Sequence, residues 1–594
     1  MKKLNISSFL IIFIFLQINA LPAIRYVKAG NPTPLAPYTS WATAADSIWK
    51  ALRISVSGDT VFVGTGSYTV FDTLPQGVAL IGSGVDSCIF NLHPQSTVVK
   101  FSLVVYDSSV VSDIQFRGFN YYDGCAVGGH NNDNTILKNN MFTKCSIAVA
   151  AQGIKVINNV FKINQYGISD RLSSIVRNEI ITGNTFFNCT YSISLRGSKT
   201  YIRNNYFYYD GDRFPIFILD YGGGQPEITN NAFVLGRPNM FIDNLIIARN
   251  GDQIQNNVFI SPTSADEPFV YTEFPIISKN NHFEGGLIPH YLAYQAISPQ
   301  LVIKNNNYWN TRSKYYPSYN NPYKHTELQK DPMFVDSVDF HLQKYSPLID
   351  RGDSSVLDKD GSISDIGVYG GVFGESYVYI DKAPRAPAGL TVTLSADTVL
   401  LKWKKNTESD IRNYYIYTDS TTSVTTDTNR YLTSANDTLL KIPKSYFTWG
   451  SAYFRIAAID SGYNKSQGSI AVGVVLTGME EGEEIAAERY RLYQNYPNPY
   501  GGTGKEKTKI SYELKKRGYV KLRVYNVVGE ELAVLVNGER EAGYYEEEFG
   551  SPEIRKGLED HILTSGIYIY KLEIRDSETG HPVFNESKKL LYVK

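Results

Sequence analysis

Charged and amide side chains recur at matching places in the first half of the chain. Gln152, Arg171 and Arg196 each come ten residues after an aromatic residue, and four more polar residues fall near the same edge with looser spacing: Asp170, Asp220, Arg249 and Glu273. Stacked arginines bind carboxylates or sulfates through bidentate contacts. This pattern predicts that Arg171, Arg196 and Arg249 bind a ligand such as an acidic polysaccharide. The alternative is a column of solvated charges that pair with one another.

The same column contains the candidates for catalysis. Eliminative cleavage of a uronate chain needs a general base beside the uronate carboxylate, and an Arg, Lys or Tyr with a shifted pKa can serve. Asp170 or Asp220 would position that base. The catalytic candidates are therefore Asp170, Arg171, Arg196, Asp220 and Arg249. No local pattern marks one of them as the acid or the base.

A second acidic pattern, "DKDGSISDIG", contains Asp358, Asp360 and Asp365. Alternate carboxylates followed by glycine are typical of the start of a calcium loop, because a hard cation needs several oxygens from one tight turn. The twelfth position holds Tyr369 instead of glutamate. Two interpretations stay open, a calcium site and a turn that closes the last repeat. Calcium is the one cofactor that the sequence suggests.

These candidates must be positioned by a repeat of Asn, a spacer and an aromatic residue. The aromatics recur at intervals of 19 to 26 residues: Phe142, Phe161, Phe186, Phe207, Phe233, Phe259, Phe283 and Tyr308. This period is too short for a helix pair and predicts a strand solenoid whose stacked coils bury one another. Phe would stack inside, and the Asn pairs would occupy the turns and hydrogen-bond along a column.

The repeat also places the sulfurs. Cys145 and Cys189 each come three residues after a repeat Phe, with Asn164 at the equivalent place of the coil between them. The two cysteines then lie two coils apart, at roughly twice the ~4.8 Å strand spacing, which is too far for a disulfide. We expect buried, unreactive thiols.

From about Ile24 to Gly374 the chain resembles the right-handed parallel β-helix of secreted bacterial proteins and polysaccharide lyases. The matching segments are "RYVKAGNPTPLAPYTSWATAADSIWKAL", with a capping helix expected at about 42–52, and "DPMFVDSVDFHLQKYSPLIDRGDSS". The resemblance implies an all-β fold for residues 24–375. The catalytic motifs of the family's hydrolases and calcium-dependent lyases are not matched, since "GGHNNDN" holds only His130, and no catalytic residue is carried over.

The composition changes after the solenoid. A linker at 376–385 precedes residues 386–476, which resemble a fibronectin type III β-sandwich with Trp403 and Tyr453 as core aromatics. After an acidic linker, 477–489, residues 490–594 resemble the C-terminal β-sandwich sorting domain of type IX secretion cargo. The matching blocks are "QNYPNP", "VYNVVGEE", "SGIYIY" and "KKLLYVK". This resemblance implies that the type IX secretion machinery is a partner.

The first 23 residues are typical of a secretory signal peptide, with Lys2 and Lys3 before the apolar run Phe9 to Leu16. We expect a secreted or outer-surface protein that passes through the periplasm and has no membrane span after signal removal. A formal net charge of -1 argues against a global attraction to nucleic acid.

Three functions remain open at this stage. The first is recognition of polysaccharide without cleavage. The second is a polysaccharide lyase or glycoside hydrolase acting on acidic glycans. The third is a structural or adhesive surface protein. Recognition fits the export signals and the arginine column, since a catalytic set is not evident.

Overall fold

The computed structural model describes residues 21–92, 101–118, 124–129, 134–151, 153–169, 178–196, 199–211, 215–220, 224–236, 245–249, 251–261, 268–285, 288–293, 296–476, 490–495, 498, 500, 507–550, 566–577 and 579–592. The chain divides into two compact units, Met1–Asp381 with Thr407–Ser409, and Lys382–Asn406 with Asp410–Lys594. Within the described ranges, no helix combines the length and apolar character needed to cross a membrane.

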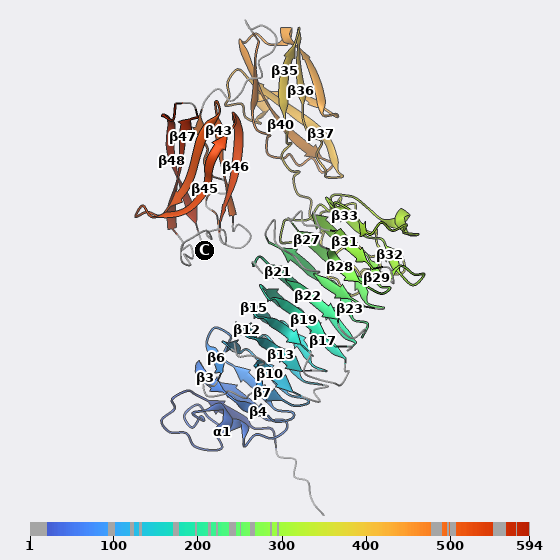
Figure 1. The fold of residues 1–594 in the computed structure, drawn as a ribbon, viewed down its shortest axis with the longest axis vertical. Coiled ribbons are helices and arrows are strands. Elements are labelled where there is room, and N and C mark those ends of the chain that lie inside the picture. Colours follow the sequence, from blue (N-terminus) through green and yellow to red (C-terminus); the bar gives the residue numbers. More distant parts are fainter. Residues whose placement is uncertain are drawn as a thin grey trace, which may run out of the picture. The chain divides into compact units, whose positions relative to one another are not determined.

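The first unit is a parallel β-solenoid built from three sheets, which confirms the predicted fold class (Figure 1). Sheet A has twelve strands: β1 (Ile24–Val27), β2 (Thr60–Val63), β5 (Ala79–Gly82), β8 (Val110–Ser112), β11 (Ile136–Lys138), β14 (Lys155–Ile157), β17 (Glu179–Thr182), β20 (Thr200–Arg203), β23 (Glu227–Thr229), β26 (Gln253–Gln255), β29 (Ile277–Lys279) and β32 (Val302–Lys304).

Sheets B and C have eleven strands each. Sheet B consists of β3 (Gly66–Val70), β6 (Cys88–Leu92), β9 (Gln115–Arg117), β12 (Met141–Thr143), β15 (Val160–Lys162), β18 (Thr185–Phe187), β21 (Tyr206–Tyr209), β24 (Ala232–Leu235), β27 (Val258–Ser261), β30 (His282–Gly285) and β33 (Asn307–Trp309). Sheet C consists of β4 (Asp72–Leu74), β7 (Phe101–Val105), β10 (Cys125–Gly129), β13 (Ile147–Ala151), β16 (Tyr166–Ser169), β19 (Tyr191–Leu195), β22 (Ile216–Asp220), β25 (Ile246–Ala248), β28 (Pro268–Thr272), β31 (Ile288–Leu292) and β34 (Tyr315–Tyr316).

The repeat aromatics form one continuous stack inside the solenoid. From Phe116 to Phe283 the ring centroids of successive coils lie 4.6–5.0 Å apart, and Tyr308 continues the stack at 5.5 Å. All these rings are buried. The prediction that Phe points inward and stacks on the next coil is confirmed.

The two members of each Asn pair have different roles. The first adopts a left-handed backbone, with φ between 53° and 58° at Asn139, Asn158, Asn204, Asn230, Asn256, Asn280 and Asn305. The second is buried, and its Oδ1 accepts the backbone N–H of its counterpart one coil earlier at 2.8–3.0 Å; this ladder contains Asn140, Asn159, Asn184, Asn205, Asn231, Asn257, Asn281 and Asn306. The ladder satisfies backbone groups that burial at the sharp turn removes from water.

The four cysteines are buried free thiols. Cys145 and Cys189 share one column, because Asn164 between them accepts the Cys145 N–H (2.8 Å) and donates to the Cys189 Sγ (3.8 Å). Burial raises the pKa of the Cys189 thiol to about 12. The predicted column is confirmed, and the Cys189 thiol is protonated at neutral pH.

Both ends of the solenoid are covered. At the N-terminal end lies α1 (Ile48–Leu52), which buries Ile48, Ala51 and Leu52 against the first coils. The helix is shorter than the expected 42–52, because the backbone of Ala45 pairs with β1 and Ser47, the residue before the helix, has an extended backbone. At the other end, beyond the short helix η2 (Lys324–Thr326), Leu328 pairs with Asn307 of the last coil.

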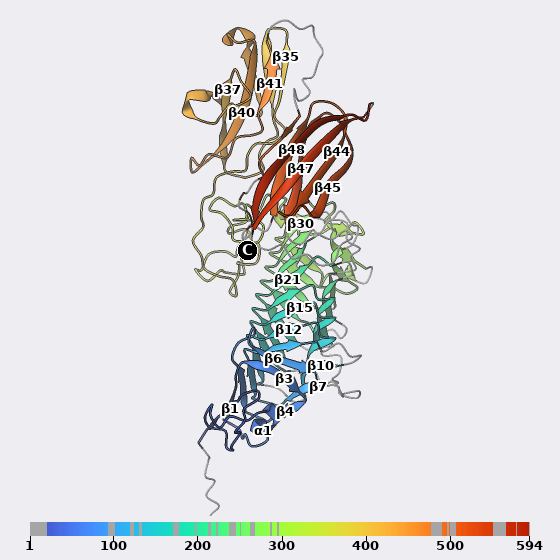
Figure 2. The ribbon, with the colours of Figure 1, turned by 90° about the vertical axis from the view of Figure 1, so that its left-hand side faces the viewer.

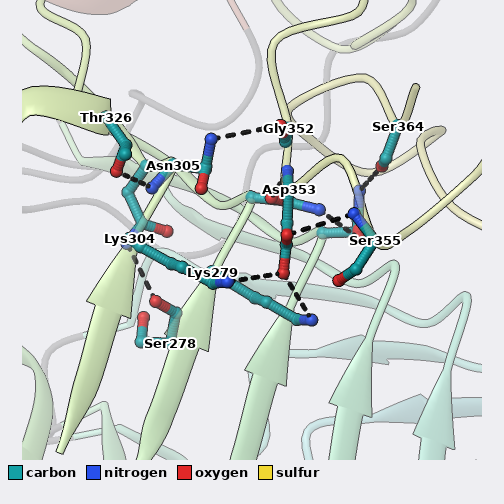
Figure 3. Close-up of polar contacts among 12 residues, drawn as sticks. Ser278, Lys279, Lys304, Asn305, Thr326, Gly352, Asp353, Ser355 and Ser364 are labelled. Atoms are coloured by element: carbon teal, nitrogen blue, oxygen red, sulfur yellow. Dashed lines mark hydrogen bonds and ion pairs between the residues drawn. The ribbon is translucent and has the colours of Figure 1, made fainter. Parts of the chain in front are cut away.

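A segment beyond the last coil, residues 350–373, returns along the solenoid and is called the strap here. It binds the outward Asn of four successive coils. Figure 3 shows the contact at Asn305. Asn305 Nδ2 donates to the Gly352 carbonyl (3.1 Å), and the Asp353 N–H donates to Asn280 Oδ1 (2.7 Å). Farther along, Asn256 Nδ2 donates to the Asp365 carbonyl and Asn230 Nδ2 to the carbonyls of Val368 and Gly370.

An ion-pair cluster fixes the strap at one end. The Asp353 carboxylate binds the ammonium groups of Lys279 (3.0 Å) and Lys304 (2.9 Å), which come from neighbouring strands of sheet A (Figure 3). Burial opposes ionisation of Asp353, but hydrogen bonds from Lys304 and Lys279 hold the pKa of this carboxyl well below its usual range.

The second unit contains four antiparallel sheets. Two sheets lie within 386–476: one of β35 (Thr391–Ser395), β36 (Thr398–Lys402) and β39 (Leu439–Pro443), the other of β37 (Ile411–Asp419), β38 (Tyr431–Ala435), β40 (Ser451–Asp460) and β41 (Val472–Val475), with the short helices η3 (Thr428–Arg430) and η4 (Lys444–Tyr446). Trp403 is buried in their core as expected. The expectation for Tyr453 is wrong, because strand alternation turns Phe454 into the core and Tyr453 to the other face.

The last two sheets have a core of their own. One consists of β42 (Arg491–Leu492), β43 (Lys507–Leu514) and β46 (Gly543–Gly550), and the other of β44 (Gly518–Tyr525), β45 (Glu531–Arg540), β47 (Gly566–Asp576) and β48 (Pro582–Tyr592).

Candidate functional site

Part of the predicted polar column comes together at the C-terminal ends of the sheet C strands. Asp220 ends β22, Arg249 directly follows β25, and Glu273 directly follows β28. Because Ala248 pairs with Thr272 in register, Arg249 and Glu273 are neighbours on adjacent coils. Arg196 is exposed and directly follows β19. Gln152, Asp170 and Arg171 lie outside the described residues.

Arg249 links these groups. Its Nε donates to the backbone carbonyl of Asp220 (3.2 Å), and its Nη1 lies 3.5 Å from the Glu273 carboxylate. The Arg249 and Glu273 side chains are 31% and 45% exposed. This half-exposed ion pair has little effect on stability but leaves both groups accessible to a ligand.

Asp220 does not face solvent. It pairs in register with Leu195, whose position points into the solenoid, and it is buried at 1% exposure. It therefore lies behind Arg249, where it cannot contact a bound polymer. At this place Asp220 could still position a neighbouring side chain, as predicted. It is too deeply buried to contact a substrate directly.

Sequence reasoning missed a second buried carboxyl at this corner, Asp252. It is 0% exposed, and its Oδ2 accepts the backbone N–H of Arg249 at 2.7 Å. Burial raises the pKa of Asp252 to about 8, and the nearby Asp220 carboxylate adds to the shift. Asp252 is therefore largely protonated at neutral pH. No pattern in "NGDQIQ" distinguishes it from an ordinary turn aspartate.

An outward row of tyrosines begins beside the Arg249–Glu273 pair. Tyr271, Tyr291 and Tyr316 pair in register on the last three strands of sheet C, with successive ring centroids 5.2 Å apart. Tyr316 lies on the edge strand of sheet C and is 53% exposed. The Tyr271 hydroxyl donates to Glu273 Oε1 (3.2 Å), which joins the row to the ion pair. Burial, and then the Glu273 charge, raise the pKa of Tyr271.

We call Arg249, Glu273, Tyr271, Tyr291 and Tyr316 together the tyrosine face. It presents hydroxyls, ring edges, one cation and one anion along the axis of the solenoid. Repeating sugar units need such alternating polar and apolar contacts. The sequence signal for this face was weak, because the loop before each tyrosine differs in length and hides the common register.

The three aspartates of the predicted calcium loop have separate hydrogen-bond partners. The Asp358 carboxylate accepts the N–H groups of Asp365 and Gly371. Asp365 accepts the Asp350 N–H and the Tyr379 hydroxyl, each at 2.9 Å. Asp360 is exposed and binds Ser362. Donors bind both carboxylate oxygens of Asp358 and of Asp365, which fits a loop-closing turn. The calcium site stays a prediction.

Comparison with known proteins bears on the fold alone. No protein-family model matches the chain, and no curated protein matches it. Among solved structures, the chain is similar to pectate lyase Pel9A (14% identity, 59% of this chain and 97% of that chain, TM-score 0.33). It is also similar to an alginate lyase from Paenibacillus sp. str. FPU-7 (12%, 47% and 94%, TM-score 0.28).

A third similar structure is the spore cortex lytic enzyme SleM from Clostridium perfringens (22% identity, 16% of this chain, TM-score 0.13). The match spans only 29% of the SleM chain. At these identities and scores, no activity is transferred from any of the three.

Proposed function

We propose that the protein recognises polysaccharide, and that the tyrosine face is the contact surface. The observation that carries the proposal is the in-register row Tyr271, Tyr291 and Tyr316, which starts at the half-exposed Arg249–Glu273 pair. The row runs parallel to the stacking axis, so successive sugars would meet equivalent side chains on successive coils. Arg249 would bind a uronate carboxylate or a sugar hydroxyl, and Arg196 would extend the contact.

Binding by affinity electrophoresis of the full mature protein tests this proposal. A panel of neutral and uronate polysaccharides is run with the parent protein, Tyr291→Ala and Tyr316→Ala. Each substitution is expected to weaken binding of the preferred glycan about fivefold to tenfold, since one aromatic contact contributes roughly 1 kcal/mol. Tyr446→Ala, which removes an exposed tyrosine of the second unit, is the matched control. Binding that is equal in all four proteins would exclude the tyrosine face.

Cleavage of an acidic glycan is the second candidate function. It is favoured by the contact chain of the Tyr271 hydroxyl, the Glu273 carboxylate and the Arg249 guanidinium on a half-exposed surface. The Glu273 carboxylate would take the proton from the carbon beside the uronate carboxylate, Tyr271 would donate a proton to the leaving oxygen as the C–O bond breaks, and Arg249 would neutralise the uronate carboxylate. The test is the absorbance of newly formed unsaturated ends with alginate and polygalacturonate, with and without calcium. Product formation that Tyr271→Phe abolishes would establish a lyase. Glycan binding without newly formed unsaturated ends would support recognition without cleavage. If neither binding nor new ends are observed, a structural or adhesive protein is favoured.

We also propose that the chain is exported by the type IX route, with residues 490–594 as the sorting domain. The independent core of the last two sheets supports a separately folding domain. The test is a fluorescent reporter fused to residues 477–594, expressed with a signal peptide in a bacterium that has this machinery. Reporter outside the cell supports the proposal, and a fusion to residues 386–476 is the control that should stay in the periplasm.

A further inference from the structure

Sheet B carries a row of cations near its N-terminal end. Arg117 ends β9, Lys144 directly follows β12, and Lys162 ends β15, so three successive coils each contribute one cation at the same end of their strands. The backbone N–H of Lys144 donates to the Lys162 carbonyl at 3.2 Å, which places these two residues side by side. All three residues are exposed. We call them the cation row; in Figure 2 they belong to the sheet in which β12 and β15 are labelled.

No carboxylate neutralises the cation row in the part of the chain that the structure describes. None of the three residues makes an ion pair with another described residue, and the Lys162 ammonium instead lies 5.7 Å from the Phe187 ring centroid. The five strands β9, β12, β15, β18 and β21 contain neither Asp nor Glu. The described residues 134–169 include four lysines and no acid. The chain as a whole has a net charge of -1, so this concentration of positive charge is local.

The row continues into aromatic side chains and then ends. In the same register as Lys162, the next two coils present Phe187 and Tyr208, whose rings stack at 5.1 Å and are half-buried. Beyond them, Val234 of β24 is buried in a cluster with Phe340 and residues of the strap. The solvent-exposed part of this face therefore contains the three cations and then the two aromatic side chains. It ends where the strap covers the sheet at Val234.

We propose that the cation row is a binding surface for a linear polysaccharide with an anionic group on its repeating units. The row presents one cation per coil at the ~4.8 Å strand spacing. Arg117 and Lys162 share one register position with Thr143, and Lys144 lies one residue farther along the coil between them. A regular polymer that lies parallel to the axis brings an anionic group to each of these cations. Phe187 and Tyr208 extend the contact with apolar ring edges, which suit the C–H groups of sugars. The Tyr208 hydroxyl donates to the carboxylate of Asp210, which directly follows β21 (3.4 Å). The surface lies on sheet B, whereas the tyrosine face lies on sheet C.

The charge distribution favours this ligand over nucleic acid. Nucleic-acid binding proteins generally neutralise many phosphates and carry an extended basic surface. Here the positive charge is limited to three residues on a chain whose charges otherwise balance. Nucleic acid is therefore an outcome that the experiment must exclude.

The experiment uses the full mature protein and three immobilised polymers: alginate, neutral dextran and a single-stranded oligonucleotide. The triple variant Arg117→Glu, Lys144→Glu and Lys162→Glu is compared with a control that carries the same charge change at exposed positions of the second unit, Lys402→Glu, Lys404→Glu and Lys441→Glu. We expect the first variant to bind alginate about tenfold more weakly at low salt, with the difference shrinking as salt is added. The control variant should bind as the parent does.

Three results would overturn the inference. The first is an equal loss of alginate binding in the triple variant and in its control, and the second is no loss of alginate binding in the triple variant. The third is an oligonucleotide affinity that equals the alginate affinity and falls with it in the triple variant. The single variants Lys144→Gln and Lys162→Gln should each cause a partial loss, and circular dichroism of every variant checks that the solenoid is intact.

The inference does not depend on the tyrosine face. Tyr291→Ala should leave the salt-sensitive alginate binding of the cation row unchanged, and the triple charge reversal should leave neutral-glycan binding unchanged. If glycan binding is lost only in the charge-reversal variant, the cation row is supported and the tyrosine face is rejected as a glycan site. If glycan binding is lost only in Tyr291→Ala, the tyrosine face is supported and the cation row is rejected.

Discussion

Asn256 and Asn257 are adjacent in the sequence, yet their side chains bind opposite sides of the solenoid wall. Inside, Asn257 Oδ1 accepts the backbone N–H of Asn231 at 2.9 Å. Outside, Asn256 Nδ2 donates to Ser364 Oγ and to the Asp365 carbonyl, each at 2.9 Å. One dipeptide thus joins its coil to the preceding coil and to the strap.

The inner member of the pair should be the more important for stability. Asn257→Ala leaves the buried Asn231 N–H without its acceptor and removes the side-chain bonds to the Ile228 and Gln255 carbonyls. It is expected to lower the free energy of unfolding by about 2–4 kcal/mol. Asn256→Gly keeps the left-handed backbone and removes the strap bonds and a long bond from Asn280 Nδ2 (3.4 Å), so about 1 kcal/mol is expected. Urea unfolding of the two variants measures the difference, and equal losses would contradict the assignment.

The aromatic stack predicts that substitution of two adjacent phenylalanines lowers the free energy of unfolding by very different amounts. Phe186 is fully buried between Phe161 and Phe207, so Phe186→Ala should cost about 3–5 kcal/mol through lost burial and a cavity. Phe187 is half-buried on the outer surface, and Phe187→Ala should cost about 1 kcal/mol. Thermal unfolding of the pair distinguishes them, and a larger effect at Phe187 would show that the strand faces are exchanged.

Asp252 should make the solenoid less stable as pH rises. Its pKa of about 8 in the folded state exceeds the value of about 4 in an unfolded chain. The folded state therefore binds the extra proton between these pH values, so stability is highest at the acidic end of this window and falls until about pH 8.

Asp252→Asn keeps an acceptor for the Arg249 N–H and cannot ionise. We expect this variant to match the parent near pH 4 and to exceed it at pH 9 by a few kcal/mol. Unfolding curves across this range provide the measurement. A constant difference at every pH would show that the pKa of Asp252 is the same in the folded and unfolded states.

Asp353 should act in the opposite sense. Its lowered pKa means that its ion pairs with Lys279 and Lys304 stabilise the strap above about pH 4 and are lost as pH falls below it. Asp353→Asn should loosen the strap by about 1–3 kcal/mol at neutral pH, since two charged partners lose their counterion. Hydrogen exchange of residues 350–371 measures this, with the amides of β12 as an internal control that should not change.

The sequence alone was sufficient for the features that depend on local spacing. The regular return of Phe and Asn predicts the solenoid, the inward stack and the shared column of Cys145 and Cys189, because each coil repeats one backbone path. The division of work within each Asn pair was not predictable, since both members are the same residue and only the backbone angle separates them.

Contacts between distant segments could not be predicted. The bonds between Asn230 and the strap span 138 and 140 residues, and no periodicity connects these positions. Asp220 and Asp252 lie close together because of where two loops of different length rejoin the strands of the solenoid. The tyrosine row and the cation row each follow the coil register, but variable loops between strands conceal that register from a count of residues.

The covers at the two ends of the solenoid hinder the stacking of one copy of the chain on the end of another. A bare last coil would offer the unpaired N–H and C=O groups of β32, β33 and β34, and another copy's first coil presents complementary groups in the same parallel arrangement. α1 and the Leu328 segment prevent such end-to-end growth. A chain that lost both covers would be expected to form filaments, with the inner Asn ladder continuing from one molecule into the next.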